Sequence, residues 1–296
     1  SFTSQTFAGQ ARAVRVTIPA TVTSISAGAF AGCSNLKSVT INGTGLKSIG
    51  ATAFKGCSNL EAFVMPHSVE TVGQGVFSGC TSLESITLSD KLSQIPGVEW
   101  VSGAMSYNSD RYNDSFGTIG AENGFFYNCT SLKTINWGKG IKTIGNIAFR
   151  NCSALESVAI PDTVTSIGYH AFVGCSALTP VTIGNNVTEV GRRAFQGLPN
   201  LTKVEFGSKV NHIDVQAFEN CVNLQNFTLP ATIQYINYRA FAGCSKALTV
   251  VTIPTNKDEL ETEFGQGVFS GCSKLETVTF GDTVKIIPGV EWVSGA

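Results

Sequence analysis

Three histidines are the only candidates for a general base in the 296-residue chain. His67 follows an apolar run, His170 stands two residues before a phenylalanine, and His212 lies inside another apolar segment. They fall at three different phases of the repeating pattern described below, so we expect them to point in three directions. Catalysis and metal binding both need side chains within reach of one another. The histidines therefore predict neither an enzyme nor a metal site.

The cysteines are the other residues with chemical potential, and their spacing indicates a structural role. Leu198 and Gln10 take the cysteine site in two repeats, and a leucine there implies a buried apolar position. Free cysteine behaves as a small hydrophobic residue. We expect a buried ladder of reduced thiols without disulfides, and no Cys-x-x-Cys zinc pattern occurs. Each cysteine follows a phenylalanine by three residues and so occupies one site of its own repeat: Cys33, Cys57, Cys80, Cys129, Cys152, Cys175, Cys221, Cys244 and Cys272.

A period of 23 residues organises the chain from Phe7 to Phe269. In the strand pattern L-x-x-V-x-I, Val39 and Ile41 alternate inward while Ser38 faces outward. This period and pattern predict a leucine-rich repeat solenoid of about 11 coils. We expect a right-handed solenoid with a parallel β-sheet on the concave face and short turns or 3₁₀ segments, instead of long helices, on the convex face. Strand cores are expected at residues 13–18, 36–41, 60–65, 83–88, 132–137, 155–160, 178–183, 201–206, 224–229, 248–253 and 275–280.

A second apolar pair follows each strand, as in Val164 and Ile167, and a turn comes next. Because Gly, Asn and Asp tolerate positive φ best, we expect a left-handed backbone in this turn. Only five residues lie between the phenylalanine and the next strand, as from Phe30 to Leu36, which leaves room for a single helical turn. The turn carries Gly50, Gly73, Gly145, Gly168, Gly191, Asp214 and Asn237.

Two insertions interrupt the period of what we predict to be one domain over residues 1–296. Cys80 and Cys129 lie 49 residues apart instead of 23, which predicts an insertion at 96–125. Cys244 and Cys272 lie 28 apart, which predicts a small loop or short helix at 255–264. Residues 73–104 and 265–296 match at 22 of 32 positions, and no capping sequence closes the second copy. We therefore expect the parent protein to continue beyond Ala296.

The longer insertion is the first candidate binding site. It combines aromatic residues with adaptable polar ones, as antibody paratopes do, and long loops in compact folds are often functional. The alternative is that its aromatics pack over neighbouring coils. The run N-S-D-R-Y-N-D-S has oxygens suited to calcium but lacks EF-hand spacing, so no metal site is predicted. The candidate residues are Trp100, Tyr107, Asp110, Arg111, Tyr112 and Phe116.

The outward file of the strand is the second candidate site. Curved solenoids commonly bind partners on this surface. Strong interfaces are usually anchored by Trp, Tyr or Arg, and this file offers small residues, so either weak extended contact or mere β-forming propensity explains it. Its residues are Thr40, Thr87, Thr182, Thr228, Thr252 and Thr279.

The block A-F-x-G-C-S-x-L-x-x-V-T-I-P-x-x-V-x-S-I-G resembles the BspA-like, Treponema pallidum-type leucine-rich repeats. The resemblance covers nearly the whole chain outside the insertion. It implies a bacterial surface protein, or one from a protist that shares the family, associated with adhesion to host proteins or to other bacteria. The departures are Leu198 for cysteine and Gly184, Gly207 and Gly281 for proline. The motif is structural, so the resemblance transfers no binding residues.

The composition excludes two classes of partner, nucleic acids and the membrane interior. The net charge is −1, which provides no electrostatic surface for nucleic acid, and no apolar run is long enough to insert into a membrane. We predict a non-enzymatic, secreted or cell-surface interaction module without cofactors, whose partner is a protein or glycan of a host or neighbouring cell. The main alternative is a structural spacer within a longer surface protein. A more distant alternative is a hydrolase or metal-dependent enzyme using Asp110, Asp114 and Glu122.

Overall fold

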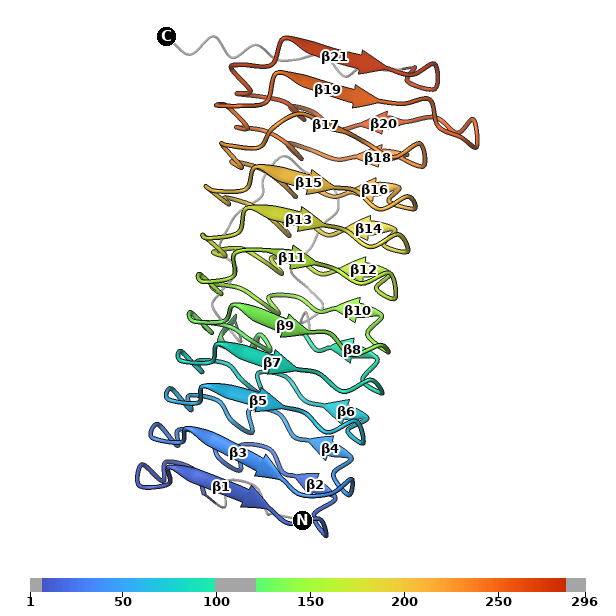
Figure 1. Cartoon of the computed structure of the whole chain (residues 1–296). Helices are drawn as coiled ribbons and strands as arrows, with labels where there is room; N and C mark the ends of the chain where they lie inside the picture. Colours follow the sequence, from blue (N-terminus) through green and yellow to red (C-terminus); the bar gives the residue numbers. More distant parts are fainter. Residues whose placement is uncertain (1–6, 99–120, 286–296) are drawn as a thin grey trace, which may run out of the picture.

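The computed structural model describes residues 7–98 and 121–285, which form a stack of coils running from the N-terminal to the C-terminal end (Figure 1). The described part is a parallel β-solenoid of about 11 turns with almost no helix, so the predicted fold is confirmed. Each complete coil contributes a first strand, a second strand and a turn segment. The coil therefore has three sides, two made of parallel strands and one made of turns.

The first strands occupy the positions predicted from L-x-x-V-x-I. They stack in register, with Val16 opposite Val39 and Val181 opposite Val204. Their bounds are β1 (Arg15–Ile18), β3 (Ser38–Ile41), β5 (Ala62–Val64), β7 (Ser85–Thr87), β9 (Thr134–Asn136), β11 (Val158–Ala159), β13 (Pro180–Thr182), β15 (Lys203–Glu205), β17 (Phe227–Thr228), β19 (Val250–Ile253) and β21 (Thr277–Phe280).

The second apolar pair of each repeat forms a second set of parallel strands, which the sequence did not reveal as a sheet. Seven of these strands, β8 to β20, make one continuous sheet, and β2, β4 and β6 make another. Their bounds are β2 (Ser24–Ile25), β4 (Ser48–Ile49), β6 (Thr71–Val72), β8 (Gln94–Ile95), β10 (Thr143–Ile144), β12 (Ser166–Ile167), β14 (Glu189–Val190), β16 (His212–Ile213), β18 (Tyr235–Ile236) and β20 (Glu263–Phe264).

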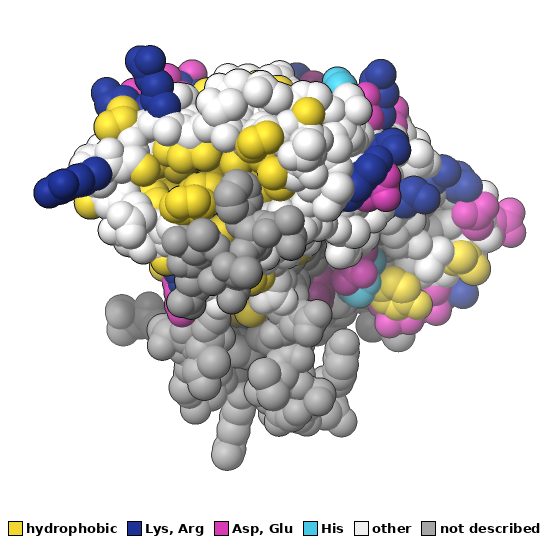
Figure 2. Space-filling model, turned by 90° about the horizontal axis from the view of Figure 1, so that it is seen from below, with side chains coloured by type: hydrophobic (Ala, Val, Ile, Leu, Met, Phe, Trp, Pro, Cys, Tyr) yellow, Lys and Arg dark blue, Asp and Glu magenta, His cyan; other side chains and the backbone are white. Residues whose placement is uncertain are grey.

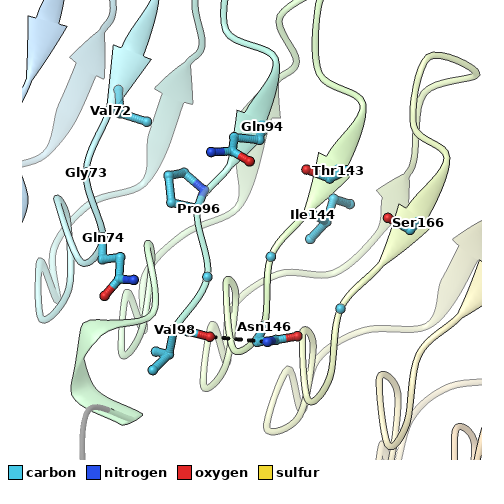
Figure 3. Close-up of a pocket in the computed structure, with 13 residues that line it drawn as sticks. Val72, Gly73, Gln74, Gln94, Pro96, Val98, Thr143, Ile144, Asn146 and Ser166 are labelled. Atoms are coloured by element: carbon cyan, nitrogen blue, oxygen red, sulfur yellow. Dashed lines mark hydrogen bonds between the residues drawn. The ribbon is translucent and has the colours of Figure 1, made fainter. Parts of the chain in front are cut away.

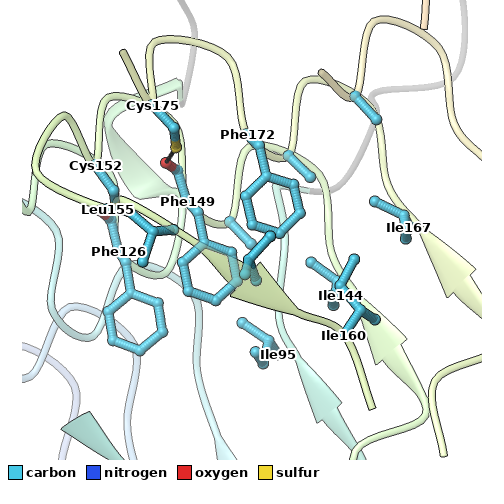
Figure 4. Packing of buried hydrophobic residues seen from close by; sticks show 14 of the residues in the cluster. Ile95, Phe126, Ile144, Phe149, Cys152, Leu155, Ile160, Ile167, Phe172 and Cys175 are labelled. Carbon is cyan, nitrogen blue, oxygen red and sulfur yellow. Dashed lines mark hydrogen bonds between the residues drawn. The ribbon is translucent and has the colours of Figure 1, made fainter. Parts of the chain in front are cut away.

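The repeat phenylalanines form a column of stacked rings inside the solenoid. Phe172 lies between Phe149 and Phe195, with ring centroids 5.1 and 5.0 Å away and nearly parallel planes. These side chains are fully buried, and Figure 4 shows Phe126, Phe149 and Phe172 side by side above the inward isoleucines. Each ring therefore fills the space between its two neighbours and helps to set the spacing of the coils.

The predicted cysteine ladder is confirmed: all nine thiols are free and buried. Each Sγ donates to the carbonyl oxygen of the phenylalanine one coil earlier. Cys175 reaches Phe149 O at 3.2 Å, as Figure 4 shows, and Cys221 reaches Phe195 O at 3.1 Å. The thiol thus serves both as a small apolar group and as a donor for a buried carbonyl oxygen.

The left-handed residues do not lie where the sequence predicted them. Gly50, Gly73 and their equivalents have no positive φ. Glycine is favoured at this site because the backbones of adjacent coils approach closely: a Cβ at Gly73 would lie 2.3 Å from the backbone nitrogen of Ala51 in the preceding coil. Positive φ occurs two residues later, as at Thr52 and His170, and again just before each cysteine. The latter site holds glycine, or asparagine at Asn128, Asn151 and Asn220.

Within residues 7–98 and 121–285, the turn side has no helical segment between a phenylalanine and the next strand, where a single helical turn was expected. The only helix among the described residues is the 3₁₀ segment η1 (Ala121–Asn123). The loop at 255–264 is not helical either. Asn256 and Thr262 anchor it, since both are buried and both donate to Ile233 O, at 2.8 and 3.2 Å.

Phe172→Ala removes the centre of three stacked rings and leaves a cavity shared by two neighbours. We expect a loss of about 3–5 kcal/mol in the free energy of unfolding, measured by urea denaturation followed by circular dichroism. Phe280→Ala is the control, because Phe280 is 37% exposed near the end of the described stack; it is expected to cost less than about 2 kcal/mol. Equal losses from both changes would contradict the stacking argument.

Burial raises the pKa of the Cys57 and Cys221 thiols to about 12. Because the thiolate is the reactive form, these cysteines are expected to stay protonated and unreactive at pH 8. Ellman's reagent should modify the folded chain slowly and all nine thiols quickly in guanidinium. Gln10→Cys places a thiol at the equivalent but exposed site of the first coil, and this variant should react at once. Rapid modification of the unaltered folded protein would contradict the buried ladder.

Candidate functional site

The predicted threonine file exists as a column on the outer side of the first strands. Thr17 lies opposite Thr40, Thr228 opposite Thr252, and Thr252 opposite Thr279. Polar and charged residues interrupt the column: Asn136 donates to Thr87 at 3.1 Å, and Thr182 donates to Glu205 at 3.1 Å. The column is therefore mostly small and polar, with Val64 opposite Thr87 and Ala159 opposite Thr182 as apolar members.

The predicted binding residues of the insertion, Trp100, Tyr107, Asp110, Arg111, Tyr112 and Phe116, lie outside the described residues. The two ends of the insertion are fixed to the solenoid. Asn146 Nδ2 donates to Val98 O at 3.2 Å, and Ser78 Oγ donates to Glu122 O at 2.5 Å. Phe125, which the sequence assigned to the insertion, is fully buried in the core beside Phe126.

The histidines lie on different sides of the solenoid. His67 Nδ1 is 3.4 Å from Asp90 Oδ2 at an exposed position. His170 stacks on the Tyr169 ring on the turn side, and His212 Nε2 lies 2.9 Å from Asn237 Nδ2 beside the second strands. Within residues 7–98 and 121–285, no three His, Cys, Asp or Glu side chains gather as metal ligands would. Glu122 is exposed.

The second sheet is split between β6 and β8. In the neighbouring coils, the residue after the second strand donates its backbone N–H to the preceding coil: Gly73 to Ile49 O at 2.8 Å, and Gly145 to Ile95 O at 2.8 Å. Pro96 occupies this site after β8 and has no N–H to donate. Among the described residues, no backbone hydrogen bond joins β6 to β8.

The missing donor, rather than side-chain bulk, explains the split. Asp214 and Asn237 also carry a Cβ at this site, yet they still donate to Val190 O and Ile213 O at 3.0 and 2.9 Å. The phenylalanine rings are more widely spaced here than the 5.0–5.3 Å found between Phe149 and Phe241, although Phe241 and Phe269 are also 5.8 Å apart. The rings of Phe54 and Phe77 are 5.8 Å apart, and those of Phe77 and Phe126 are 5.7 Å apart, because Phe63 and Phe125 pack edge-on against the column.

A groove of about 740 Å³ lies at the split (Figure 3). It falls within the range of about 300–1,000 Å³ typical of ligand pockets. Its lining comes from β6, β8, β10, β12 and the turns after them, next to the point where the insertion leaves the solenoid. None of the described lining residues is charged or aromatic: Val72, Gly73, Gln74, Gln94, Pro96, Gly97, Val98, Thr143, Ile144, Gly145, Asn146, Ser166 and Gly168.

A network of polar side chains on the turn side was also missed. Glu219 is its centre: Arg239 Nε donates to Oε1 at 2.6 Å, and Gln196 and Gln216 donate to Oε2 at 2.7 Å. Arg193 Nε donates to Gln216 Oε1 at 2.8 Å. Burial opposes the charge of Arg239, but its bond and attraction to Glu219 outweigh this and raise its pKa.

The 23-residue period could have revealed both the Glu219 network and the unusual Pro96. Residues 193, 216 and 239 follow one another at 23-residue intervals, as do 196 and 219, so the sequence places the network in adjacent coils. Pro96 is likewise a proline at a site that holds glycine, aspartate or asparagine in most other repeats, and the duplicated segment carries the same proline at Pro288. In both cases the signal is a departure from the repeat at a known phase.

Charged side chains gather at the corners of the coils. Seen along the stack from its N-terminal end, Lys, Arg, Asp and Glu occupy these corners, and apolar side chains occupy the middle of the end face (Figure 2). Phe7 and Val14, near this end, are 38% and 45% exposed. None of the described residues forms a helix that could span a bilayer.

These features define a leucine-rich repeat protein built as a parallel β-solenoid. The family model described as BspA type leucine rich repeat region matches residues 1–122, 117–248 and 165–290, and the chain belongs to this family. The resemblance stated from the sequence is therefore confirmed. A search of curated proteins finds no match.

Several solved structures are similar to this chain. A leucine-rich repeat protein from Bacteroides ovatus is 24% identical with a TM-score of 0.52, covering 96% of this chain and 85% of its own. One from Eubacterium ventriosum is 25% identical with a TM-score of 0.50, covering 98% and 82%. A leucine-rich cell surface protein from Faecalibacterium prausnitzii is 24% identical with a TM-score of 0.45, covering 91% and 79%. The first two support the fold.

Glu219→Gln tests the turn-side network. The change removes the carboxylate that pairs with Arg239 and turns an amide donor toward other donors, so we expect a loss of about 2 kcal/mol, measured by thermal and urea unfolding. Glu205→Gln is the matched control: the Glu205–Lys203 ion pair is exposed, so its loss should change the stability far less than Glu219→Gln does. If the two variants unfold alike, Glu219 does not organise a buried network.

Proposed function

We propose that this chain is a non-enzymatic interaction module of a cell-surface protein, and that it binds its partner on the side where the second sheet is split. The observation that carries the proposal is the groove between β6 and β10, beside the departure of the 96–125 insertion. On the first-strand side, the outward column consists mostly of threonines that recur from coil to coil. Binding specificity needs side chains that differ from this background, and the split and the insertion supply them.

Surface location forms part of the same proposal. The BspA-type family supports it, because the resemblance implies surface proteins that adhere to host proteins or other bacteria. The partner in this proposal is a protein or glycan of another cell, held by the groove and the insertion together. The threonine column then adds weak contacts over a longer surface.

The experiment is a binding screen on immobilised matrix proteins, mucins and glycans. It compares the intact chain with a variant in which residues 101–119 are replaced by a short Gly-Ser linker, which keeps η1 and its contacts with Ser78 and Lys55. A second variant replaces residues 257–261 in the same way and serves as the control, since Asn256 and Thr262 still anchor that loop. Circular dichroism first establishes that all three chains fold.

We expect the first variant alone to lose binding. Equal binding by all three chains would contradict a role for the insertion and direct attention to the threonine column. Absence of binding by the intact chain would contradict the interaction function and favour the structural spacer.

A further inference from the structure

The split in the second sheet exposes backbone groups that are paired in the neighbouring coils. The first of the coil-to-coil backbone hydrogen bonds is missing at Ser93. In the coils on either side, Glu70 N–H donates to Lys47 O at 2.9 Å and Lys142 N–H donates to Ser93 O at 2.8 Å. The equivalent bond from Ser93 N–H to Glu70 O is absent. The last of these bonds is missing at Pro96, which leaves the Val72 carbonyl without the bond that Ile49 O and Ile95 O accept. The split thus leaves the carbonyl oxygens of Glu70 and Val72 without their coil-to-coil donors, and it leaves the Ser93 N–H without its acceptor in the preceding coil.

The split is confined to one side of the coil. On the first-strand side, Met65 N–H donates to Thr87 O at 2.9 Å, and on the turn side Gly56 N–H donates to Ser78 O at 2.7 Å. The two coils are therefore held together on two sides and open on the third. An exposed strand edge is a template for pairing with another extended chain.

The lining of the groove indicates what kind of chain fits. Gln74, Gln94 and Asn146 supply side-chain amides, and Thr143 and Ser166 supply hydroxyls, so the walls offer both donors and acceptors without charge. A charged ligand would find no opposite charge among the described lining residues. Sugar rings are commonly held against aromatic faces, and none of those residues is aromatic. The N–H and C=O groups of a peptide can form hydrogen bonds both with these side-chain amides and with the unpaired backbone groups at the split.

We infer that the groove between β6 and β10 binds an extended, uncharged peptide segment of a partner protein, which takes up the backbone groups released by Pro96. The inference rests on the proposed interaction function and names the ligand class of the same side of the solenoid. Pro96 acts as a positioning residue: it keeps β8 from closing onto β6. The Gln74 and Gln94 amides then bond the main chain of the peptide, which gives affinity for backbone rather than for one side-chain sequence.

The test uses end-capped, fluorescently labelled octapeptides built from Gly, Ala, Ser, Thr, Asn, Gln and Val, with cello- and malto-oligosaccharides as the carbohydrate comparison. Pro96→Gly restores the missing N–H and should close the split, which hydrogen exchange detects as a newly protected amide at position 96. Pro161→Gly makes the same substitution outside the groove. The double variant Gln74→Ala with Gln94→Ala removes two amides without touching the backbone. Fluorescence anisotropy measures the affinities.

We expect capped peptides to bind the intact chain and the Pro161→Gly variant equally. Pro96→Gly and the double variant should each weaken binding about tenfold or more, which corresponds to ~1.4 kcal/mol. Three results would overturn the inference: oligosaccharides binding where peptides do not, no peptide binding at all, or unchanged binding in Pro96→Gly with a protected amide. If the matrix screen still finds a partner in these cases, the interaction function stands and only the peptide groove fails.

Discussion

Hydrogen bonding from each coil to the next is the constraint on which the whole structure depends. Parallel strands must lie about 4.8 Å apart, and each buried backbone donor needs an acceptor one coil away. A residue is therefore compatible with its site only if it packs against the equivalent residue of the neighbouring coil. The column of phenylalanine rings, the thiols that donate to Phe149 O and its equivalents, and the glycines that let backbones approach all satisfy this one requirement.

Substitutions within the repeat show which changes preserve the hydrogen bonds between coils. Asp214 and Asn237 replace glycine, but they keep the coil-to-coil bond, and Asn237 Nδ2 adds a bond to Asp214 Oδ1 at 3.0 Å. Leu198 replaces a cysteine and keeps the burial while losing the thiol donor. Pro96 differs from these substitutions because it has no backbone N–H, and no rearrangement of its side chain can restore this donor. The second sheet ends at that proline and starts again from β8.

Much of the fold could be predicted because inward residues are read directly from a repeated pattern. Val39 and Ile41, the cysteine sites and the period itself specified the first strands and the buried ladder. The second sheet was missed because its strands are two residues long, too short to show alternation. The left-handed turns were misplaced because glycine at Gly73 allows a close backbone approach, whereas positive φ falls at a site that holds Thr52 and other non-glycine residues in most coils, and at the glycine or asparagine before each cysteine.

The candidate site was harder to predict for a related physical reason. In a solenoid, most positions of the repeat are committed to stacking, so they are nearly alike from coil to coil and carry little information about a partner. Information about recognition can lie only where a coil differs from its neighbours. Pro96 and the Glu219 network are such differences, and each lies in the described structure at a phase that the repeat defines. A search for function in this fold should therefore begin with the residues that break the period and follow what each break does to the bonds between coils.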